Sequence, residues 1–251
     1  MKNLVYILCV LSLLACSRGN RSERAGRNAR PTATTETRQT TRQPRNKTPD
    51  RESRPQIVAH TSNNGELSGA DIFAKYNTAV FTVFTRDNYS MYQGSGFFIS
   101  SDGLAVSNYH VFKGTQKGKA QIKTSDGSYI DVGDVVAYDD DDDIFIFKVQ
   151  ANRHNFNYIP ISNKTVRVGE KAYAIGSPKG LENTFSSGEI SQLREGYIQI
   201  SVPIDHGSSG GVLLNSYGEA IGITTAGRDD SGANLNFAVD IQVLRKYIDI
   251  R

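Results

Sequence analysis

Residues 94–112 form the stretch GSGFFISSDGLAVSNYHVF. Two short runs of apolar, aromatic and β-branched residues flank the turn sequence SDG at residues 101–103. Such runs on either side of a glycine-containing turn predict an antiparallel hairpin. The second run ends at His110, which Val111 and Phe112 follow. The stretch therefore predicts two strands and places a titratable ring at the edge of their sheet.

Strand signals of the same kind continue on both sides of this hairpin. Six predicted strands lie at residues 79–85, 94–100, 104–108, 120–124, 129–138 and 144–149. Six more lie at residues 168–176, 184–193, 197–202, 210–215, 219–226 and 235–240. Short strands at regular spacing with turns between them are typical of barrels. We therefore expect an all-β fold of two six-stranded antiparallel β-barrels, covering about residues 70–155 and 156–251.

Helices are expected only at the two ends of this region. Residues 68–77 predict a short helix, with Ser68 as its N-cap and Asp71 three residues later. Ile241, Leu244 and Ile248 recur at helical spacing, which predicts a C-terminal helix.

The first sixteen residues have the form of a signal peptide. One lysine precedes an apolar stretch too short to span a membrane, and the stretch ends in Leu13, Leu14, Ala15 and Cys16. This ending resembles the bacterial lipobox, in which the cysteine is acylated and anchors the protein to a membrane. The prediction is a lipid-anchored protein of the bacterial cell envelope that faces the periplasm. The alternatives are an ordinary secretory signal with a chance cysteine, or an uncleaved anchor.

Residues 17–56 differ in composition from the rest of the chain. They carry eleven basic and four acidic side chains, a net charge of +7, whereas residues 57–251 carry a net charge of −5. With almost no apolar side chains, residues 17–56 predict a disordered linker. We expect a tether with weak attraction to anionic lipid or cell-wall polymer. Nucleic-acid binding is disfavoured, because the segment has no aromatic residues.

The cysteine content excludes several kinds of chemistry. The chain has two cysteines, Cys9 in the predicted signal and Cys16 at the expected lipid site. Residues 57–251 therefore have no cysteine. A disulfide framework, a thiol nucleophile and a cysteine metal site are thereby excluded. The acidic run at residues 139–143 lacks the spacing of an EF-hand. We expect no metal and no cofactor.

His110 is the candidate general base among four histidines. His60 borders the linker, His154 lies in a polar loop between the predicted barrels, and His206 lies three residues before Ser209. Of the five aspartates, Asp143 directly precedes the apolar strand at residues 144–149 and can be withdrawn from water to orient an imidazole. The other four are expected to form a solvated, self-repelling loop.

Residues 203–214, PIDHGSSGGVLL, predict either a flexible hairpin loop or a nucleophile in a cradle of backbone amides. With the histidine and aspartate segments, this stretch resembles the motifs of trypsin-like serine proteases, most closely the HtrA/Deg group. Two further segments, residues 174–191 and 235–244, resemble that group's glycine-rich stretch and its closing strand and helix. The resemblance covers residues 68–251 and implies a chymotrypsin-like double barrel.

The resemblance assigns a role to individual residues. Ser209 matches the nucleophile, His110 the base and Asp143 the residue that orients the base. The backbone amides of Gly207, Ser208 and Ser209 match the oxyanion hole. Val212 and His206 depart from the family pattern, which usually has proline at the first position and often at the second.

The substrate pocket is assigned more loosely. Pro203 stands where an aspartate would select basic side chains, so we expect small or medium aliphatic side chains before the scissile bond. Ile223, Thr224 and Thr225 are the expected pocket wall. The sequence ends soon after the last predicted helix, so no PDZ module is expected. A homotrimer is compatible with the resemblance but has no support in the sequence.

Three functions follow from these observations. The first is a lipid-anchored serine endopeptidase that hydrolyses exported or misfolded polypeptides. The second is a catalytically silent protease-fold scaffold of the cell envelope. The third is an envelope interaction protein that acts through its basic segment. The complete set of His110, Asp143 and Ser209 favours the first.

Overall fold

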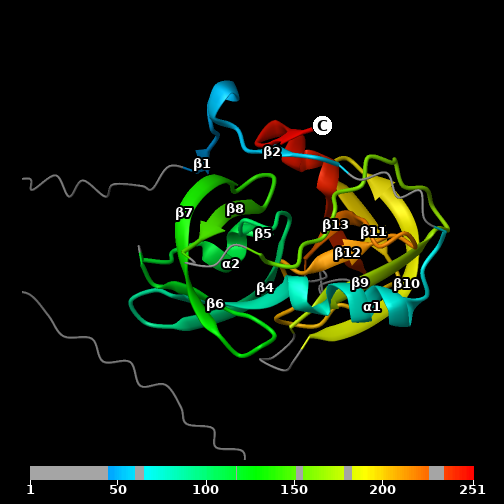
Figure 1. Cartoon of the computed structure of the whole chain (residues 1–251), viewed down its shortest axis with the longest axis horizontal. Coiled ribbons are helices and arrows are strands. Elements are labelled where there is room, and N and C mark those ends of the chain that lie inside the picture. The colour runs from blue at the N-terminus through cyan, green and yellow to red at the C-terminus, as the bar shows by residue number, and fades with distance from the viewer. Residues whose placement is uncertain (1–44, 60–64, 117, 151–154, 178–182, 226–234) are drawn as a thin grey trace, which may run out of the picture. The chain divides into compact units, whose positions relative to one another are not determined.

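The structure is a computed structural model that describes residues 45–59, 65–116, 118–150, 155–177, 183–225 and 235–251. Its strands form two closed barrels (Figure 1). The fold predicted from the sequence, two six-stranded antiparallel barrels, is confirmed.

Barrel 1 contains six strands in the order β7-β6-β3-β4-β5-β8, and pairing of β7 with β8 closes it. The strands are β3 (Val80–Arg86), β4 (Met91–Phe98), β5 (Leu104–Ser107), β6 (Ala120–Lys123), β7 (Tyr129–Asp139) and β8 (Ile144–Val149). A short helix, α2 (Tyr109–Phe112), follows β5.

Barrel 2 closes in the order β10-β11-β14-β13-β12-β9. Its strands are β9 (Lys171–Gly176), β10 (Thr184–Arg194), β11 (Tyr197–Ile200), β12 (Val212–Leu214), β13 (Ala220–Thr225) and β14 (Asn236–Asp240). Between the barrels, Ile159 and Ile161 of the connecting segment are buried, and Ile161 bridges to Ala220.

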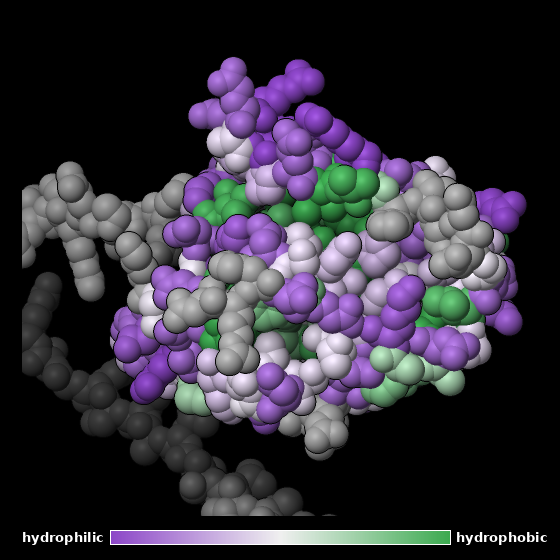
Figure 2. Space-filling model, in the orientation of Figure 1, coloured by the Kyte–Doolittle hydropathy of each residue, from purple (hydrophilic) through white to green (hydrophobic). Residues whose placement is uncertain are grey.

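The alternation of side chains along each strand produces three apolar clusters. In β8, Ile144 and Ile146 belong to a cluster that includes residues of both barrels, whereas Phe145 and Phe147 belong to a cluster made of barrel 1 alone. A third cluster contains only barrel 2 residues. Both faces of β8 are therefore buried, because one lines its own barrel and the other joins the two barrels. Figure 2 shows one face of the molecular surface, which is covered largely by hydrophilic side chains with smaller hydrophobic areas among them.

The N-terminal helix α1 (Gly69–Tyr76) begins as predicted. The Ser68 hydroxyl accepts the Asp71 amide at 3.1 Å and donates to the Asp71 carboxylate at 2.6 Å. Phe73 packs edge-on against Phe185 of β10, so the helix lies on barrel 2 (Figure 1). A 3-10 turn, η2 (Asn77–Ala79), leads from α1 into β3.

The C-terminal helix lies where the sequence predicts it, but it is a 3-10 helix, η5 (Ile241–Lys246). The Asp240 carboxylate caps it by accepting the Gln242 amide. A short strand, β15 (Asp249–Ile250), follows it and pairs in parallel with β2 (Gln56–Ile57).

The expected disordered linker, residues 17–56, differs from the structure at its C-terminal end. Here β1 (Asn46–Lys47) pairs with β7, and a 3-10 turn, η1 (Arg51–Ser53), leads to β2. Backbone pairing with two existing strands orders a segment that has few apolar side chains of its own. The rest of that linker lies outside the described residues, as do the signal peptide and Cys16.

Candidate active site

His110 is held at the start of α2 by the burial of its neighbours. Val111 and Phe112 are buried, whereas the His110 side chain is 46% exposed. The buried Thr85 hydroxyl donates to the Val111 carbonyl at 2.8 Å, which fixes the helix to β3. The apolar pair after His110 thus anchors the helix and leaves the imidazole at the surface.

Asp143 contacts His110 directly. The Asp143 carboxylate lies 2.9 Å (Oδ2) and 3.1 Å (Oδ1) from His110 Nδ1, and Oδ1 also accepts the His110 backbone amide at 2.9 Å. Since an ionised carboxylate only accepts, the neutral imidazole carries its proton on Nδ1. Its Nε2 lone pair is then available to take a proton, as a general base requires.

The backbone of Asp143 is unusual. Its φ is +49°, and it is the one non-glycine residue with positive φ among those the structure describes. Such a conformation costs about 1–3 kcal/mol, and it persists only where contacts with the surroundings compensate for this cost. Here the Asn108 side-chain amide donates to the Asp143 carbonyl at 3.0 Å. This hydrogen bond between Asn108, directly before α2, and Asp143, directly before β8, holds the backbone of Asp143 in place.

Of the four preceding aspartates, which the sequence predicts to form a solvated loop, only Asp141 is freely exposed, and the other three have close partners. Asp140 accepts from Lys113 at 3.0 and 3.1 Å, and Asp142 accepts from Lys246 at 2.8 and 2.9 Å and from the Tyr247 hydroxyl at 2.7 Å. The Asp139 carboxylate accepts two backbone amides of the turn. Cationic and hydroxyl partners from the ends of α2 and η5 offset the mutual repulsion, so the turn that carries Asp143 is anchored.

Ser209 lies in a loop whose conformation depends on glycine. Gly207 has φ +94° and Gly210 has φ +88°. A β-carbon on Gly210 would come within 2.1 Å of the Ser95 carbonyl oxygen and 2.4 Å of the Ser107 hydroxyl. Ser209 itself is buried. The glycines of the motif therefore permit both the positive φ and the close approach of barrel 1.

The loop begins with a tight turn. The Ser208 amide donates to the Asp205 carbonyl at 3.0 Å, Gly207 has positive φ, and His206 does not. This combination defines a type II turn. Within the described residues, the Gly207 amide donates no hydrogen bond. The Ser208 amide, expected in the oxyanion hole, is instead used by the turn, so Gly207 and Ser209 are the remaining donor candidates.

The loop that carries Ser209 meets barrel 1 at β4. The Ser95 amide donates to the Ser209 carbonyl at 2.7 Å. A β-carbon on Gly94 would lie 2.7 Å from the Val111 side chain and 3.1 Å from the Ser209 carbonyl oxygen. Gly94 therefore lies between α2 and the loop, with no room for a side chain. The structure thus joins His110 to Asp143 by hydrogen bonds and places Ser209 at the same border between the barrels.

The expected pocket wall, Ile223, Thr224 and Thr225, lies in β13. Ile223 is fully buried in the cluster shared by both barrels, and Thr224 is buried with its hydroxyl donating to the Ser208 carbonyl at 2.7 Å. The Ile223 side chain thus packs in the core, and the Thr224 hydroxyl holds the loop that carries Ser209. Pro203 is exposed and Thr225 is half-buried, so these two remain candidates.

Several polar residues around the loop were not identified from the sequence. Ser95, Ser107 and Asn108 are fully buried in or beside β4 and β5. The signal was present, since each is a polar residue inside an apolar run of residues 94–112. Ser95 has its partners in barrel 2, Asn108 in the acidic turn, and the Ser107 hydroxyl donates to the Ser95 carbonyl. A local sequence pattern does not show these contacts.

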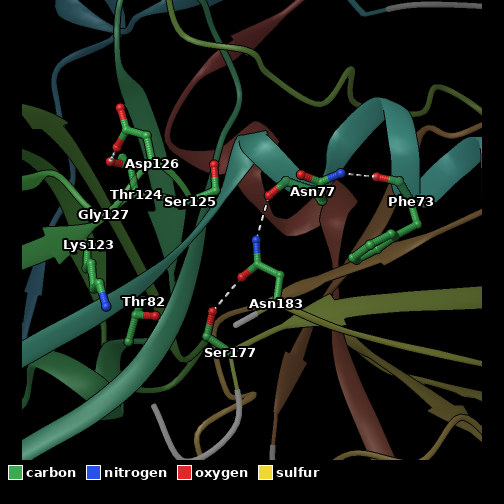
Figure 3. Close-up of a pocket in the computed structure, with 10 residues that line it drawn as sticks. All are labelled: Phe73, Asn77, Thr82, Lys123, Thr124, Ser125, Asp126, Gly127, Ser177 and Asn183. Carbon is green, nitrogen blue, oxygen red and sulfur yellow. Dashed lines mark hydrogen bonds between the residues drawn. The ribbon is translucent and has the colours of Figure 1, made fainter. Parts of the chain in front are cut away.

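A cavity of about 500 Å³ is lined in part by Ser177, the residue that follows β9. Figure 3 shows Asn183 between Asn77 and Ser177 on one wall and residues 123–127 on the other. Asn183 donates to the Asn77 and Val80 carbonyls and accepts from the Ser177 hydroxyl at 2.6 Å. This wall is therefore a connected polar network that joins α1, β3 and β9.

The remaining sequence predictions have different outcomes. His206 is exposed, as expected for a residue at the rim, whereas His60 and His154 lie outside the described residues. In the described part of the chain, no group of three or more His, Cys, Asp or Glu side chains could hold a metal ion. No helix in that part is long and apolar enough to cross a membrane.

Two closed antiparallel barrels with an imidazole–carboxylate pair and a glycine-flanked serine at their border define the chymotrypsin-like class of peptidase domains. Comparison with known proteins agrees, because residues 94–223 match the trypsin-like peptidase domain family. The chain belongs to this family.

The individual relatives are HtrA/Deg proteins. Serine protease HTRA1 of Xenopus tropicalis is 32% identical over 198 residues, which cover 71% of this chain and 42% of that protein. The Rhizobium meliloti protein named "Probable periplasmic serine endoprotease DegP-like" is 35% identical over 169 residues, 62% of this chain and 32% of that one.

A solved structure gives the same result. The crystal structure of the serine endoprotease from Yersinia pestis superimposes with a TM-score of 0.64 at 28% identity, covering 73% of this chain and 66% of that chain. The chain spans less than half of the length of each of the two relatives named above.

Proposed function

We propose that the protein is an HtrA/Deg-like serine endopeptidase that cleaves exported or misfolded polypeptides in the bacterial cell envelope. The observation that carries the proposal is the pair of contacts between the Asp143 carboxylate and His110 Nδ1, at 2.9 and 3.1 Å, beside the glycine-flanked loop of Ser209. Family membership and the names of the relatives support the same reaction.

In the proposed reaction, the Ser209 hydroxyl attacks the carbonyl carbon of the scissile peptide bond. His110 Nε2 takes the hydroxyl proton, and Asp143 stabilises the imidazolium that forms. The carbonyl oxygen becomes an oxyanion facing the amides of Gly207 and Ser209. The tetrahedral intermediate collapses to an acyl-enzyme as His110 returns the proton to the leaving amine. Water, activated by the same imidazole, then releases the acyl group.

The geometry of the turn supports a preformed oxyanion hole. Type I and type II turns differ by a flip of the central peptide, which here joins His206 to Gly207 and carries the Gly207 amide. A positive φ at Gly207 corresponds to the type II form, and its amide donates no hydrogen bond in the described chain. We propose that this amide is directed toward the substrate carbonyl.

We further propose that Cys16 carries a lipid anchor and that the following basic residues tether the domain near the membrane. The lipobox-like ending of the first sixteen residues and their net-positive continuation support this part. The name of the Rhizobium relative supports a periplasmic location. Pro203, in place of an aspartate, supports small or medium aliphatic side chains before the scissile bond.

The proposal is tested by labelling with a fluorophosphonate probe, which reacts with activated serines. We expect labelling of the wild type, loss of labelling in Ser209→Ala and His110→Ala, and retained labelling in Ser208→Ala. Labelling that survives Ser209→Ala would contradict the assignment of the nucleophile. No wild-type labelling, with and without added unfolded protein, would favour a catalytically silent scaffold.

A further inference from the structure

We propose that Ser95 and Thr224 form a hydroxyl clamp that positions the nucleophile loop. The two residues lie in different barrels, Ser95 in β4 and Thr224 in β13, and both side chains are buried. The inference rests on the proposed function, because it assigns positioning residues to the same reaction.

Ser95 holds the first half of the loop. Its hydroxyl donates to the Gly207 carbonyl at 2.7 Å and accepts the Ser177 amide at 2.8 Å, while its own amide donates to the Ser209 carbonyl at 2.7 Å. One residue of barrel 1 therefore binds two carbonyls of a barrel 2 loop. It also ties that loop to the end of β9, where Ser177 begins the polar network of Figure 3.

Thr224 holds the second half. The Ser208 carbonyl accepts from the Thr224 hydroxyl at 2.7 Å and from the Gly211 amide at 2.9 Å. Both lone pairs of this carbonyl oxygen are therefore used. Three consecutive carbonyls, those of residues 207, 208 and 209, are thus fixed by Ser95 and Thr224 together.

Fixing a carbonyl also fixes an amide. A peptide unit is planar and trans, so its N–H points away from its C=O. The unit that contains the Ser208 carbonyl also contains the Ser209 amide, which must point away from Thr224. The unit that contains the Gly207 carbonyl contains the Ser208 amide, which meets the Asp205 carbonyl and completes the turn. The clamp thereby sets the direction of one oxyanion donor and the position of the turn that carries the other.

The consequence is kinetic. Removing one oxyanion donor outright lowers kcat by about 10²–10³-fold. Loosening the loop leaves both donors in place but poorly directed, so we expect a smaller effect. Ser95→Ala and Thr224→Val should each lower kcat by about 10–100-fold and leave KM within about twofold. Thr224→Ser, which keeps the hydroxyl, should retain most of the activity.

The chain offers a matched control in Ser162. Its hydroxyl is also fully buried, donates to the Glu219 carboxylate at 3.1 Å and accepts the Lys164 amide at 3.2 Å. Ser162→Ala removes the same kind of two-bond hydroxyl from a place that does not touch the loop. We expect it to lower the melting temperature about as much as Ser95→Ala and to leave kcat unchanged.

A peptide boronate separates positioning from general stability, because it forms a tetrahedral adduct that needs the oxyanion donors. We expect boronate affinity to fall in Ser95→Ala and Thr224→Val in proportion to kcat/KM. Binding of an uncleaved peptide, measured with Ser209→Ala added to each variant, should not change.

Two outcomes would overturn the clamp while leaving the proposed function in place. One is a labelled, active wild type whose kcat is unaffected by both substitutions. The other is a loss in kcat that Ser162→Ala reproduces. A wild type that no fluorophosphonate labels would contradict the proposed function itself, and with it the clamp.

Discussion

At the scale of single residues, Asp143 combines a strained backbone with the contact that defines the site. Its carboxylate holds both the ring and the amide of His110, and Asn108 holds its carbonyl. A positive φ at a non-glycine residue persists only where neighbouring groups fix it. Here those groups belong to His110, the proposed catalytic histidine, and to Asn108, the N-cap of the helix that contains His110.

Replacing this carboxylate by an amide tests its role. Asp143→Asn keeps the size of the side chain but can donate to Nδ1, which favours the tautomer with its proton on Nε2. We expect kcat to fall by about 10⁴-fold near neutral pH, as such a change does in the Ser-His-Asp template. The control is Asp141→Asn in the same turn, since the Asp141 carboxylate is 87% exposed and has Arg45 at 3.7 Å as its ion pair. Equal losses in both variants would contradict the assignment.

Gly210 gives a second test at this scale. Gly210→Ala combines positive φ with a β-carbon 2.1 Å from the Ser95 carbonyl oxygen. We expect a loss of at least about 3 kcal/mol in the free energy of unfolding, measured with urea. Gly127→Ala is the matched control, because its φ is +85° but nothing lies within 4 Å of the added carbon. It should cost only about 1 kcal/mol. Similar losses at both sites would argue against the close approach of the barrels.

At the scale of elements, the acidic turn between β7 and β8 connects distant parts of the chain. Asp142 binds Lys246 of η5 and the hydroxyl of Tyr247, which is buried. Arg45, next to β1, pairs with Asp140 at 3.7 Å. The two ends of the described chain thus contact the turn that carries Asp143.

The contact of Tyr247 predicts a dependence on pH. Burial, reinforced by the neighbouring Asp142 carboxylate, raises the pKa of Tyr247 far above its usual value near 10. The unfolded chain therefore releases this proton at a lower pH than the folded chain. Stability is fully present below pH 10 and is lost as pH rises above it, by about 1.4 kcal/mol per pH unit.

Tyr247→Phe should remove this contribution, so its stability should fall less steeply between pH 10 and 11.5 than that of the wild type. Urea unfolding at several pH values provides the measurement. Tyr89→Phe is the control, because Tyr89 is 94% exposed. A Tyr247→Phe curve parallel to the wild type would show that the buried hydroxyl does not hold its proton.

At the scale of the whole molecule, the protease domain is joined to a segment that the sequence assigns to membrane attachment. The proposed catalytic residues, His110, Asp143 and Ser209, all lie in the described two-barrel region, whereas Cys16 lies outside the described residues. We therefore expect attachment and catalysis to be separable. Cys16→Ser should move the protein from the membrane fraction to the soluble fraction and leave fluorophosphonate labelling unchanged. Cys9→Ser is the matched control and should remain with the membrane. If Cys16→Ser stays membrane-bound and cannot be labelled with palmitate, the lipid anchor is wrong.

Much of the fold could be predicted because its strands follow simple patterns. Each of the twelve predicted segments overlaps one barrel strand, since turn residues mark the ends of the segments and apolar residues fill them. We could not predict that β1 and β2 are ordered, because both depend on backbone pairing with distant strands, β7 and β15, and only Ile57 of their four residues is buried. The contact between His110 and Asp143 followed from family resemblance and from the position of each residue at a strand end.

The remaining features depend on contacts between barrels. The sequence does not predict the hydrogen bonds of Ser95 and Thr224, since each residue bonds to a loop more than ten residues away in sequence. For the same reason the sequence predicts the Ser208 amide as an oxyanion donor, whereas in the structure this amide donates to the Asp205 carbonyl of the turn. Hydrogen-bond partners of buried polar groups are set by tertiary structure, and local patterns do not determine them.

The central claim is that Ser209 is the nucleophile activated by His110 and Asp143. It is tested most directly by locating the fluorophosphonate adduct with tandem mass spectrometry on the peptide that contains both Ser208 and Ser209. We predict a single adduct on Ser209 that is absent from His110→Ala. An adduct on Ser208, or one on Ser209 that forms equally fast in His110→Ala, would contradict the account.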